Sequence, residues 1–291
     1  MEDRLVRGTA FQGCVRLFAA TTTHLVGELQ RRHDTWPTAS AALGRTVTIA
    51  AMMGATLKGK GSVTVRIKGD GALGEIVADA TPEGEVRGYV REPHTHFPAN
   101  ALGKLDVARA VGHGMLYVIK DLGLREPYRG SVQLVSGEIG EDFAHYFASS
   151  EQTPSSVGVG VIVDTDNRIR AAGGFLLQLL PDTEESVICA LEERLRVIRP
   201  ISSLVDEGAT AEEIAAYVVG EDGHFRKQEE MPLRFACRCS RGKVGNILKG
   251  FGREEVEAML REKGEAEVIC HFCNERYLFD RSDLESLLQE V

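Results

Sequence analysis

Four cysteines lie close together in the last fifth of this 291-residue chain, and their spacing restricts how that region can fold. Cys237 and Cys239 form a C-x-C pair, and after thirty intervening residues Cys270 and Cys273 form a C-x-x-C pair. Two such pairs supply the four sulfur ligands of a tetrahedral zinc site, and a shell of four cysteines leaves no position for water or substrate. The pattern therefore predicts a structural zinc ion rather than a catalytic one.

The C-x-C pair also points to redox chemistry. Its spacer is shorter than the about two to four residues usual between zinc-binding cysteines, and it places two thiols close enough to oxidise to each other. A site that holds zinc when reduced and forms short-range disulfides when oxidised is a candidate redox switch. The other two cysteines, Cys14 and Cys189, stand alone and are expected to be ordinary thiols at apolar positions.

The composition is that of a globular protein, with 43% hydrophobic residues and a length that suits one large domain and a smaller module. The N-terminal residues contain no apolar stretch of signal-peptide length, and no run approaches the roughly 18 apolar residues of a membrane span. We therefore expect a cytoplasmic protein with no membrane partner. A reducing compartment disfavours permanent disulfides, which strengthens the interpretation of the cysteines as a zinc site.

The net charge of −9 is concentrated in one segment. Residues 1–180 carry 19 basic and 19 acidic side chains, residues 181–230 carry 5 and 13, and residues 231–291 carry 10 and 11. The acidic middle segment, called the connector below, is either a part that behaves separately from its neighbours or a solvated helical surface. No segment is basic enough to indicate a nucleic-acid interface.

The first segment mixes helix and strand patterns. A run of small and apolar residues predicts a buried helix over residues 38–57, with Thr38 as its cap. Alternation with a period of two predicts a half-buried strand over residues 62–68. We expect further strands at residues 74–78, 85–90, 115–119, 131–136, 157–163 and 169–180. The predicted fold class is α+β, with a mixed strand and helix body over residues 1–180.

The connector is predicted to be helical with breaks. Apolar residues recur at helical spacing over residues 187–198, and Pro200 ends the run. A capping-box pattern over residues 210–213 begins a second helix, which Gly220 ends. Turn-forming residues follow, and from Met231 onwards we expect a small four-cysteine zinc module, residues 231–291.

Within this module the sequence predicts two helices and a hairpin. One helix covers residues 253–262 and is closed by Gly264. A terminal helix begins with a capping-box pattern at residues 282–285. Apolar residues at 268–269 and 277–279 lie on either side of the C-x-x-C pair, as the two strands of a β-hairpin would. The thiols of that pair would lie at the turn, and zinc would link the turn to the C-x-C segment.

Other motifs have simpler explanations. The G-x-G-x-x-G pattern over residues 69–74 precedes a strand pattern and not a helix, so it indicates a tight turn rather than a dinucleotide site. His94 and His96 lie between prolines and are expected in an exposed loop. His271 lies inside the C-x-x-C pair but outside a shell that four thiolates already complete. No nucleophile and base share a recognisable local spacing, but catalytic triads assemble across a fold, so this observation does not exclude one.

The cysteine segments closely resemble a known protein family. The two cysteine pairs, within Phe235–Ser240 and Cys270–Tyr277 and together with Glu254 and Glu255, are similar to the thirty-three-kilodalton heat-shock protein family of redox-regulated chaperones. Motifs along the body share the resemblance: Gly69–Gly71, Lys120–Gly123, Pro127–Tyr128, Ser136–Ile139, Ser150–Gln152, Pro154–Ser155, Ala172–Gly174, Gln178 and Pro181. The resemblance therefore covers almost the whole chain, and only Cys14 and Cys189 among the cysteines lie outside the family pattern.

This resemblance implies an ATP-independent holdase chaperone and not an enzyme. In the reduced state the family's four thiolates, here Cys237, Cys239, Cys270 and Cys273, bind one zinc ion and the chaperone is inactive. The resemblance further implies that oxidation joins Cys237 to Cys239 and Cys270 to Cys273, releases the zinc and unfolds the connector. The exposed apolar surface then binds unfolding client proteins, often as a homodimer.

The sequence leaves two other functions open. One is an interaction module in which zinc only stabilises a domain that docks protein or nucleic acid; the near-neutral module and the acidic connector weigh against nucleic acid. The other is a thiol oxidoreductase that uses Cys270 and Cys273. Such enzymes usually lower the pKa of the attacking thiol at a helix N-terminus, whereas this pair is predicted at a hairpin turn.

Overall fold

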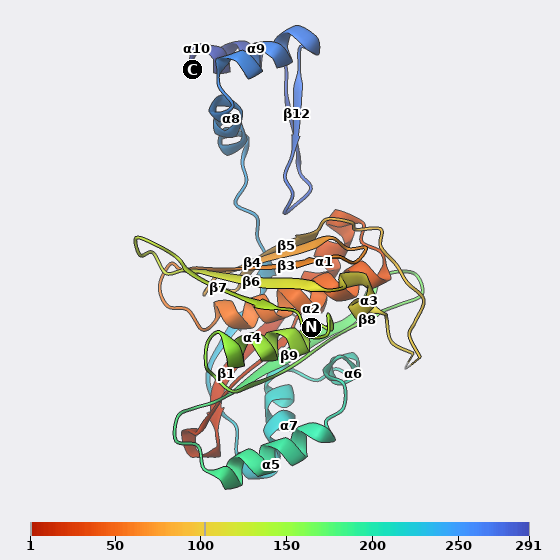
Figure 1. Cartoon of the computed structure of the whole chain (residues 1–291), viewed down its shortest axis with the longest axis vertical. Helices are drawn as coiled ribbons and strands as arrows, with labels where there is room; N and C mark the ends of the chain where they lie inside the picture. The colour runs from red at the N-terminus through yellow and green to blue at the C-terminus, as the bar shows by residue number, and fades with distance from the viewer. Residues whose placement is uncertain (1, 102, 291) are drawn as a thin grey trace. The chain divides into compact units, whose positions relative to one another are not determined.

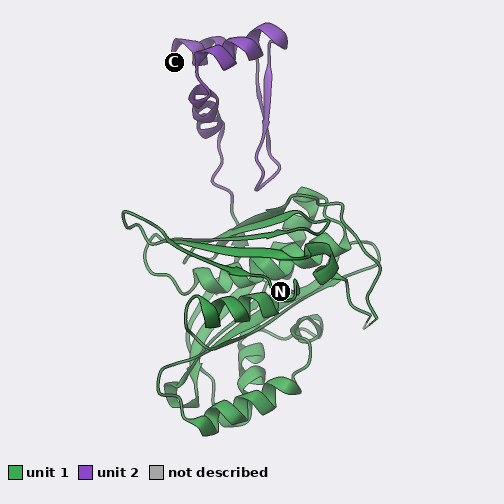
Figure 2. Cartoon of the chain, in the orientation of Figure 1, with its two compact units in different colours: residues 1–236 green, residues 237–291 purple. Residues whose placement is uncertain are grey.

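The computed structural model describes residues 2–101 and 103–290. The chain divides into two compact units, residues 1–236 (unit 1) and residues 237–291 (unit 2), which Figure 2 colours separately. The α+β fold class predicted from the sequence is confirmed. These units differ from the three segments drawn from the sequence, because the connector and residues 231–236 belong here to unit 1.

Unit 1 is built on two sheets. The five-stranded sheet has the order β10-β1-β2-β9-β8, with every neighbouring pair antiparallel. Its strands are β1 (Arg4–Ala10), β2 (Val15–Thr21), β8 (Ser155–Val163), β9 (Ile169–Leu179) and β10 (Arg226–Pro232). The six-stranded sheet has the order β11-β5-β4-β3-β6-β7, and only its β11-β5 pair is parallel. Its strands are β3 (Ser62–Gly69), β4 (Glu75–Ala80), β5 (Glu85–Val90), β6 (Gly114–Asp121), β7 (Tyr128–Gln133) and β11 (Arg234–Phe235).

The predicted helix of small residues lies between the two sheets (Figure 1). This helix, α2 (Pro37–Gly54), is buried along nearly its whole length, because alanine, glycine and threonine let both sheets approach it closely. A methyl group at Gly44 would lie 2.7 Å from the side chain of Val161. The other helical elements of the body are η1 (Phe11–Gly13), α1 (Thr23–His33), α3 (Val107–Val111) and α4 (Gly140–Ser149).

The predicted cap of α2 is wrong. Pro37 is the first helical residue and Trp36 precedes it, so Thr38 already lies inside the helix. Proline is well suited to this first position because the N–H it lacks has no partner within the helix. The Thr38 hydroxyl instead accepts a hydrogen bond from the backbone N–H of Phe97, at 3.1 Å. Thr38 therefore fixes a loop against the helix rather than ending it.

Seven of the strands in unit 1 were predicted from sequence, and three strands of seven residues each were missed. The predicted strand over residues 62–68 is β3, and a tight turn joins it to β4, with the N–H of Gly69 donating to the carbonyl of Gly74. The turn interpretation of the glycine motif is thus confirmed. The missed strands are β1, β2 and β10. β10 is charged and exposed, so it has no alternation of apolar residues to reveal it.

The connector folds as three helices, α5 (Glu185–Arg196), α6 (Ile201–Asp206) and α7 (Ala211–Gly223), and its last residues, 226–230, lie in β10 rather than in the predicted turn. The predicted capping box is confirmed, since Thr210 accepts from the N–H of Glu213 and the Glu213 carboxylate accepts from the N–H of Thr210, at 3.2 and 2.8 Å. Gly220, with φ of 71°, interrupts the helix where its end was predicted. Figure 1 shows these helices on the side of the five-stranded sheet away from α2, where they bury a second core cluster that includes Leu17, Phe175, Leu191, Ile214 and Val218.

Unit 2 contains three helices and one hairpin within its described residues. They are α8 (Arg241–Gly250), α9 (Arg253–Glu262), β12 (Ala266–Ile269), β13 (Arg276–Phe279) and α10 (Arg281–Gln289). The predicted helix over residues 253–262 and the predicted hairpin are confirmed, and Gly264 adopts a positive φ just after α9. α8 was not predicted. The capping box of α10 uses Asp280 and Asp283 rather than the predicted Ser282 and Glu285.

No described helix, in either unit, is long and apolar enough to cross a membrane.

Candidate metal centre

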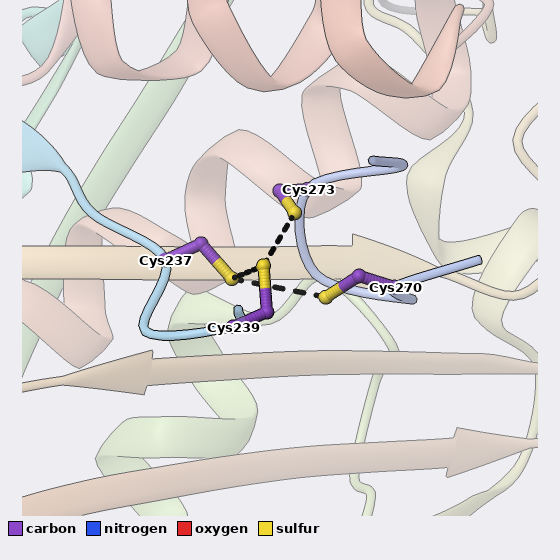
Figure 3. Close-up of side chains that lie close together, drawn as sticks. All are labelled: Cys237, Cys239, Cys270 and Cys273. Atoms are coloured by element: carbon purple, nitrogen blue, oxygen red, sulfur yellow. Dashed lines mark hydrogen bonds between the residues drawn. The ribbon is translucent and has the colours of Figure 1, made fainter. Parts of the chain in front are cut away.

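The four cysteines of unit 2 converge on one point. Their sulfur atoms all lie within 4.8 Å of one another, and Figure 3 shows them directed together from two separate loops. The sulfur of Cys239 lies 3.4 Å from that of Cys237 and 3.3 Å from that of Cys273, and the sulfurs of Cys237 and Cys270 are 3.7 Å apart. Thus the structure brings together all four residues that the sequence predicted as ligands.

The turn of the hairpin places Cys270 and Cys273. The N–H of Cys270 donates to the carbonyl of Glu275 at 2.9 Å, and the N–H of Asn274 donates to the carbonyl of Cys270 at 2.8 Å. Asn274 has φ of 59°, in the left-handed region that asparagine tolerates better than most residues. This tight loop lets two side chains three residues apart point to the same side.

The C-x-C segment is tied to the hairpin by contacts that do not involve sulfur. Arg241, at the start of α8, donates to the carbonyl of Leu278 and pairs with Asp283, both at 2.6 Å. Its guanidinium also lies over the ring of Phe279, 4.5 Å from the centroid. The role of Arg241 could not be predicted from the sequence, because Arg241 bonds to residues about forty positions further along the chain. No local sequence pattern indicates such a contact.

Tyr277 adds a hydrogen bond to the cluster. Its hydroxyl, on β13, donates to the sulfur of Cys239 at 3.1 Å, which favours the thiolate of Cys239. The hydrogen bond to Cys239 raises the pKa of Tyr277 above its ordinary value. Tyr277 was predicted only as a strand residue, and its role becomes visible only when β13 is placed beside the C-x-C segment.

The thiols do not ionise equally. Burial raises the pKa of Cys273 and of Cys239. Burial also acts to raise the pKa of Cys237, but the backbone N–H of Cys239 and the neighbouring thiols outweigh it and lower the pKa of Cys237 to about 7. A cation among the sulfurs would favour the thiolate form of all four.

The cluster can hold a metal ion. For an ion bound tetrahedrally at about 2.3 Å from each sulfur, neighbouring sulfurs lie about 3.8 Å apart. The separations of 3.3, 3.4 and 3.7 Å are close to that value, and all the sulfurs lie within 4.8 Å of one another, so binding an ion needs shifts of about 1 Å or less. Four sulfur donors suit a soft or borderline metal and leave no open coordination position.

The other singled-out residues lie outside this centre. Cys14 is half-buried beside the second core cluster, as predicted, whereas Cys189 is exposed on α5 and its predicted apolar position is wrong. His94 is exposed, as predicted for a loop, and its Nε2 lies 3.1 Å from the carboxylate of Asp34, a contact that the sequence did not indicate. His271 is exposed and is not among the clustered ligands.

Comparison with known proteins identifies the family. The family model described as Hsp33 protein matches residues 3–280. The chain belongs to the Hsp33 family. Hsp33 proteins are non-enzymatic chaperones, which bind unfolded proteins, so the prediction that the chain is not an enzyme is confirmed.

Curated Hsp33 proteins match the chain along its whole length. The 33 kDa chaperonin of Geobacillus kaustophilus is 54% identical over 290 residues, which cover 99% of this chain and 98% of that protein. The 33 kDa chaperonin of Bacillus subtilis is also 54% identical, with 99% of each chain covered. The crystal structure of the 33 kDa chaperonin of Thermotoga maritima superposes with a TM-score of 0.92 at 37% identity, covering 100% of this chain and 99% of that one. The resemblance noted in the sequence is thereby confirmed.

Proposed function

We propose that this protein is a redox-regulated, ATP-independent holdase. In this proposal the reduced, zinc-bound form is inactive, and oxidation of the four cysteines releases zinc and exposes a surface that binds unfolding client proteins. The observation that carries the proposal is the convergence of four thiols within 4.8 Å in a unit with a very small core. Such a unit can be unfolded by chemistry at its cysteines alone.

Zinc is the metal that best suits the cluster. When bound, it would hold the four cysteines as thiolates and join the hairpin to the C-x-C segment. Structural zinc contributes on the order of 10–16 kcal/mol of apparent binding free energy to small domains. The six buried apolar residues of unit 2 are a small core for a module of this size, so the metal site is expected to decide whether unit 2 is folded.

Oxidation would convert the four thiolates into two disulfides. For each disulfide, one peroxide molecule accepts two electrons from two thiolates, one S–S bond forms and the O–O bond breaks to give two hydroxide ions. We propose the pairs Cys237 with Cys239 and Cys270 with Cys273. The 3.4 Å sulfur separation in the first pair supports this, although Cys239 is equally close to Cys273.

The choice of pairs decides what oxidation does to the fold. Disulfides within each pair would leave the hairpin and the C-x-C segment unconnected. Disulfides between the segments, Cys239 with Cys273 and Cys237 with Cys270, would replace the metal by covalent links and keep unit 2 folded. The proposed switch therefore requires the local pairs, and peptide mapping of the oxidised protein by mass spectrometry tests that assignment.

Unfolding of the connector would follow the loss of unit 2. Its 5 basic and 13 acidic side chains repel one another, which favours an expanded chain once packing weakens. Its helices cover apolar residues of the five-stranded sheet, and this cover is what unfolding would remove. We further propose that the protein works in the reducing cytoplasm and dimerises when oxidised, without nucleic-acid or membrane partners.

The proposal is tested by measuring zinc release and chaperone activity in the same samples. A chromogenic chelator reports zinc, and suppression of the thermal aggregation of citrate synthase reports holdase activity, before and after peroxide treatment at raised temperature. The expected result is one zinc ion released per chain as activity appears. Zinc retained without activity would instead assign the protein as an interaction module that zinc stabilises.

A further inference from the structure

Strand β8 forms an open edge of the five-stranded sheet. It pairs with β9 on one side only, and all nine of its residues are half-buried. In the part of the chain that the structure describes, no backbone hydrogen bond joins its outer side to another element. In an antiparallel edge strand every second residue directs its N–H and C=O groups away from the partner strand. α4 approaches this edge at Val157, where a methyl group on Gly140 would lie 3.3 Å from the carbonyl oxygen. Beyond Val157, β8 presents a row of backbone donors and acceptors that another strand can bind.

This edge lacks the features by which proteins usually block strand addition. Edges are commonly protected by charged side chains or proline. At the opposite edge of the same sheet, β10 (Arg226–Pro232) carries four charged residues and ends in proline. β8 has the sequence SSVGVGVIV, with neither charge nor proline, and its one irregularity is a bulge between Ile162 and Val163. The two edges of one sheet thus have opposite properties.

A groove runs along the open edge. Its volume is about 620 Å³, within the about 300–1,000 Å³ typical of binding sites, and residues 156–163 line it. One wall includes Arg45 and Leu105, and the other includes Leu195 and residues 198–203 of the connector.

Most of the residues that line the groove are uncharged. Two cations that line it are already neutralised, since Arg45 pairs with Glu138 and Arg199 pairs with Glu207. The third, Lys104, is exposed.

We propose that an unfolding client protein adds an extended, uncharged segment to the free edge of β8. Main-chain hydrogen bonds would supply affinity without regard to client sequence, and the valines and glycines of β8 favour β-prone apolar residues beside them. Because connector residues form one wall, unfolding of the connector would widen the groove. The inference rests on the proposed holdase function, for which it names the binding site and the conformation of the client.

The test places charges on the open edge. Ser156 and Ile162 line the groove, and neither belongs to a core cluster. Lysine at both positions should therefore block the addition of a strand to the edge with little loss of packing in unit 1. The double variant S156K/I162K is compared with Q133K/Q228K, which adds the same charge at exposed positions on β7 and β10. Oxidised S156K/I162K is expected to need about tenfold more protein to suppress citrate synthase aggregation, as the loss of a few edge hydrogen bonds predicts. Q133K/Q228K should match the wild type.

Hydrogen exchange on the oxidised wild type tests the same site without a substitution. Backbone amides of residues 156–163 should gain protection when unfolding citrate synthase is added. Unchanged protection in a protein that suppresses aggregation would overturn the inference and leave the holdase function intact. Protection that appears without client and rises with chaperone concentration would assign the edge to a second copy of the chain, and would also overturn it. An oxidised wild type without holdase activity would remove the proposed function itself.

Discussion

Different interactions stabilise the fold of each of the two units. Unit 1 has two sheets, with α2 buried between them and a second apolar cluster beneath the connector helices. The described residues of unit 2 include an apolar cluster with six buried members and a four-cysteine cluster. Large apolar residues of unit 2 also remain exposed, including Ile247, Phe251 and Leu278.

This difference in stabilising interactions determines which part of the molecule oxidation can unfold. Apolar burial is insensitive to oxidants, so α2 and the six-stranded sheet of unit 1 should keep the same fold in reducing and oxidising conditions. A fold that depends on four thiolates and a metal ion is lost when those thiolates are oxidised. The contrast in construction therefore suits the proposed function, in which a stable body carries a region that responds to oxidation.

Removing one metal ligand should have the largest effect. Replacing the buried Cys273 by serine removes one of four sulfur donors, so the variant should lose most of a metal-binding free energy on the order of 10–16 kcal/mol. Unit 2 should unfold while α2 and the six-stranded sheet of unit 1 stay folded, as amide NMR spectra of the two units would show. Cys189→Ser, at an exposed cysteine outside the cluster, is the control and should change neither unit. A folded, metal-free unit 2 in the Cys273→Ser protein would contradict the comparison.

Matched cavities in the two cores should have unequal consequences. Leu284 in unit 2 and Leu43 in unit 1 are both almost fully buried, and Leu→Ala at such sites costs about 2–5 kcal/mol. Leu284→Ala should lower the melting temperature of unit 2 alone and make it lose metal at a lower chelator concentration. Leu43→Ala should lower the melting temperature of unit 1 alone. Thermal unfolding followed by residue-resolved NMR separates the two, and equal shifts of both units from either variant would show that they do not unfold independently.

A smaller loss of stability is expected from removing the N-terminal cap of α10. The Asp280 carboxylate accepts from the N–H of Asp283, and the Asp283 carboxylate accepts from the N–H of Asp280, both at 2.9 Å. Asp280→Ala should destabilise unit 2 by about 1 kcal/mol. Ser282→Ala, at the cap predicted from sequence, removes only a side-chain bond to Asp280 and should cost less. Chelator-induced unfolding of unit 2 ranks the two, and the reverse order would restore the sequence-based assignment.

The smallest expected effect concerns a surface carboxylate of unit 1. The hydrogen bond from Arg31, with a second from Arg32, lowers the pKa of Glu28 below its ordinary 4.5. A lowered folded-state pKa means that Glu28 stabilises unit 1 above its unfolded pKa and that this stability is lost as pH falls through the folded value. Glu28→Gln should therefore destabilise unit 1 by about 0.3–0.5 kcal/mol at pH 7 and by nothing in acid. Urea unfolding followed by the fluorescence of Trp36, the only tryptophan, measures it. A difference that persists in acid would exclude this ion pair as its cause.

Much of the fold could be predicted where local chemistry decides the structure. The capping box at Thr210, the period-two alternation of β3 and the small residues of α2 each depend on neighbours close in sequence. β10 could not be predicted, because it is charged, exposed and paired with β1 more than two hundred residues away. Its strand character comes from that pairing and not from its own residues.

The candidate site divides in the same way. Cysteine spacing predicts the four thiols that the structure brings together, because metal chelation depends on residue type and short separations. Tyr277 and Arg241 could not be predicted, since they reach the cluster and its hairpin only after α8, β13 and α10 have packed. The exposure of Cys189 was missed because a lone cysteine carries no sign of which helix face it occupies.

Hydrogen exchange before and after oxidation measures directly whether unit 2 and the connector unfold while the rest of unit 1 does not. Amide protection would be measured in the reduced, zinc-loaded protein and again after peroxide at raised temperature. We expect the backbone amides of residues 237–290 and of the connector to lose protection, while those of α2 and the six-stranded sheet keep theirs. Retained protection in residues 237–290 after zinc has left, or simultaneous loss throughout unit 1, would contradict this expectation.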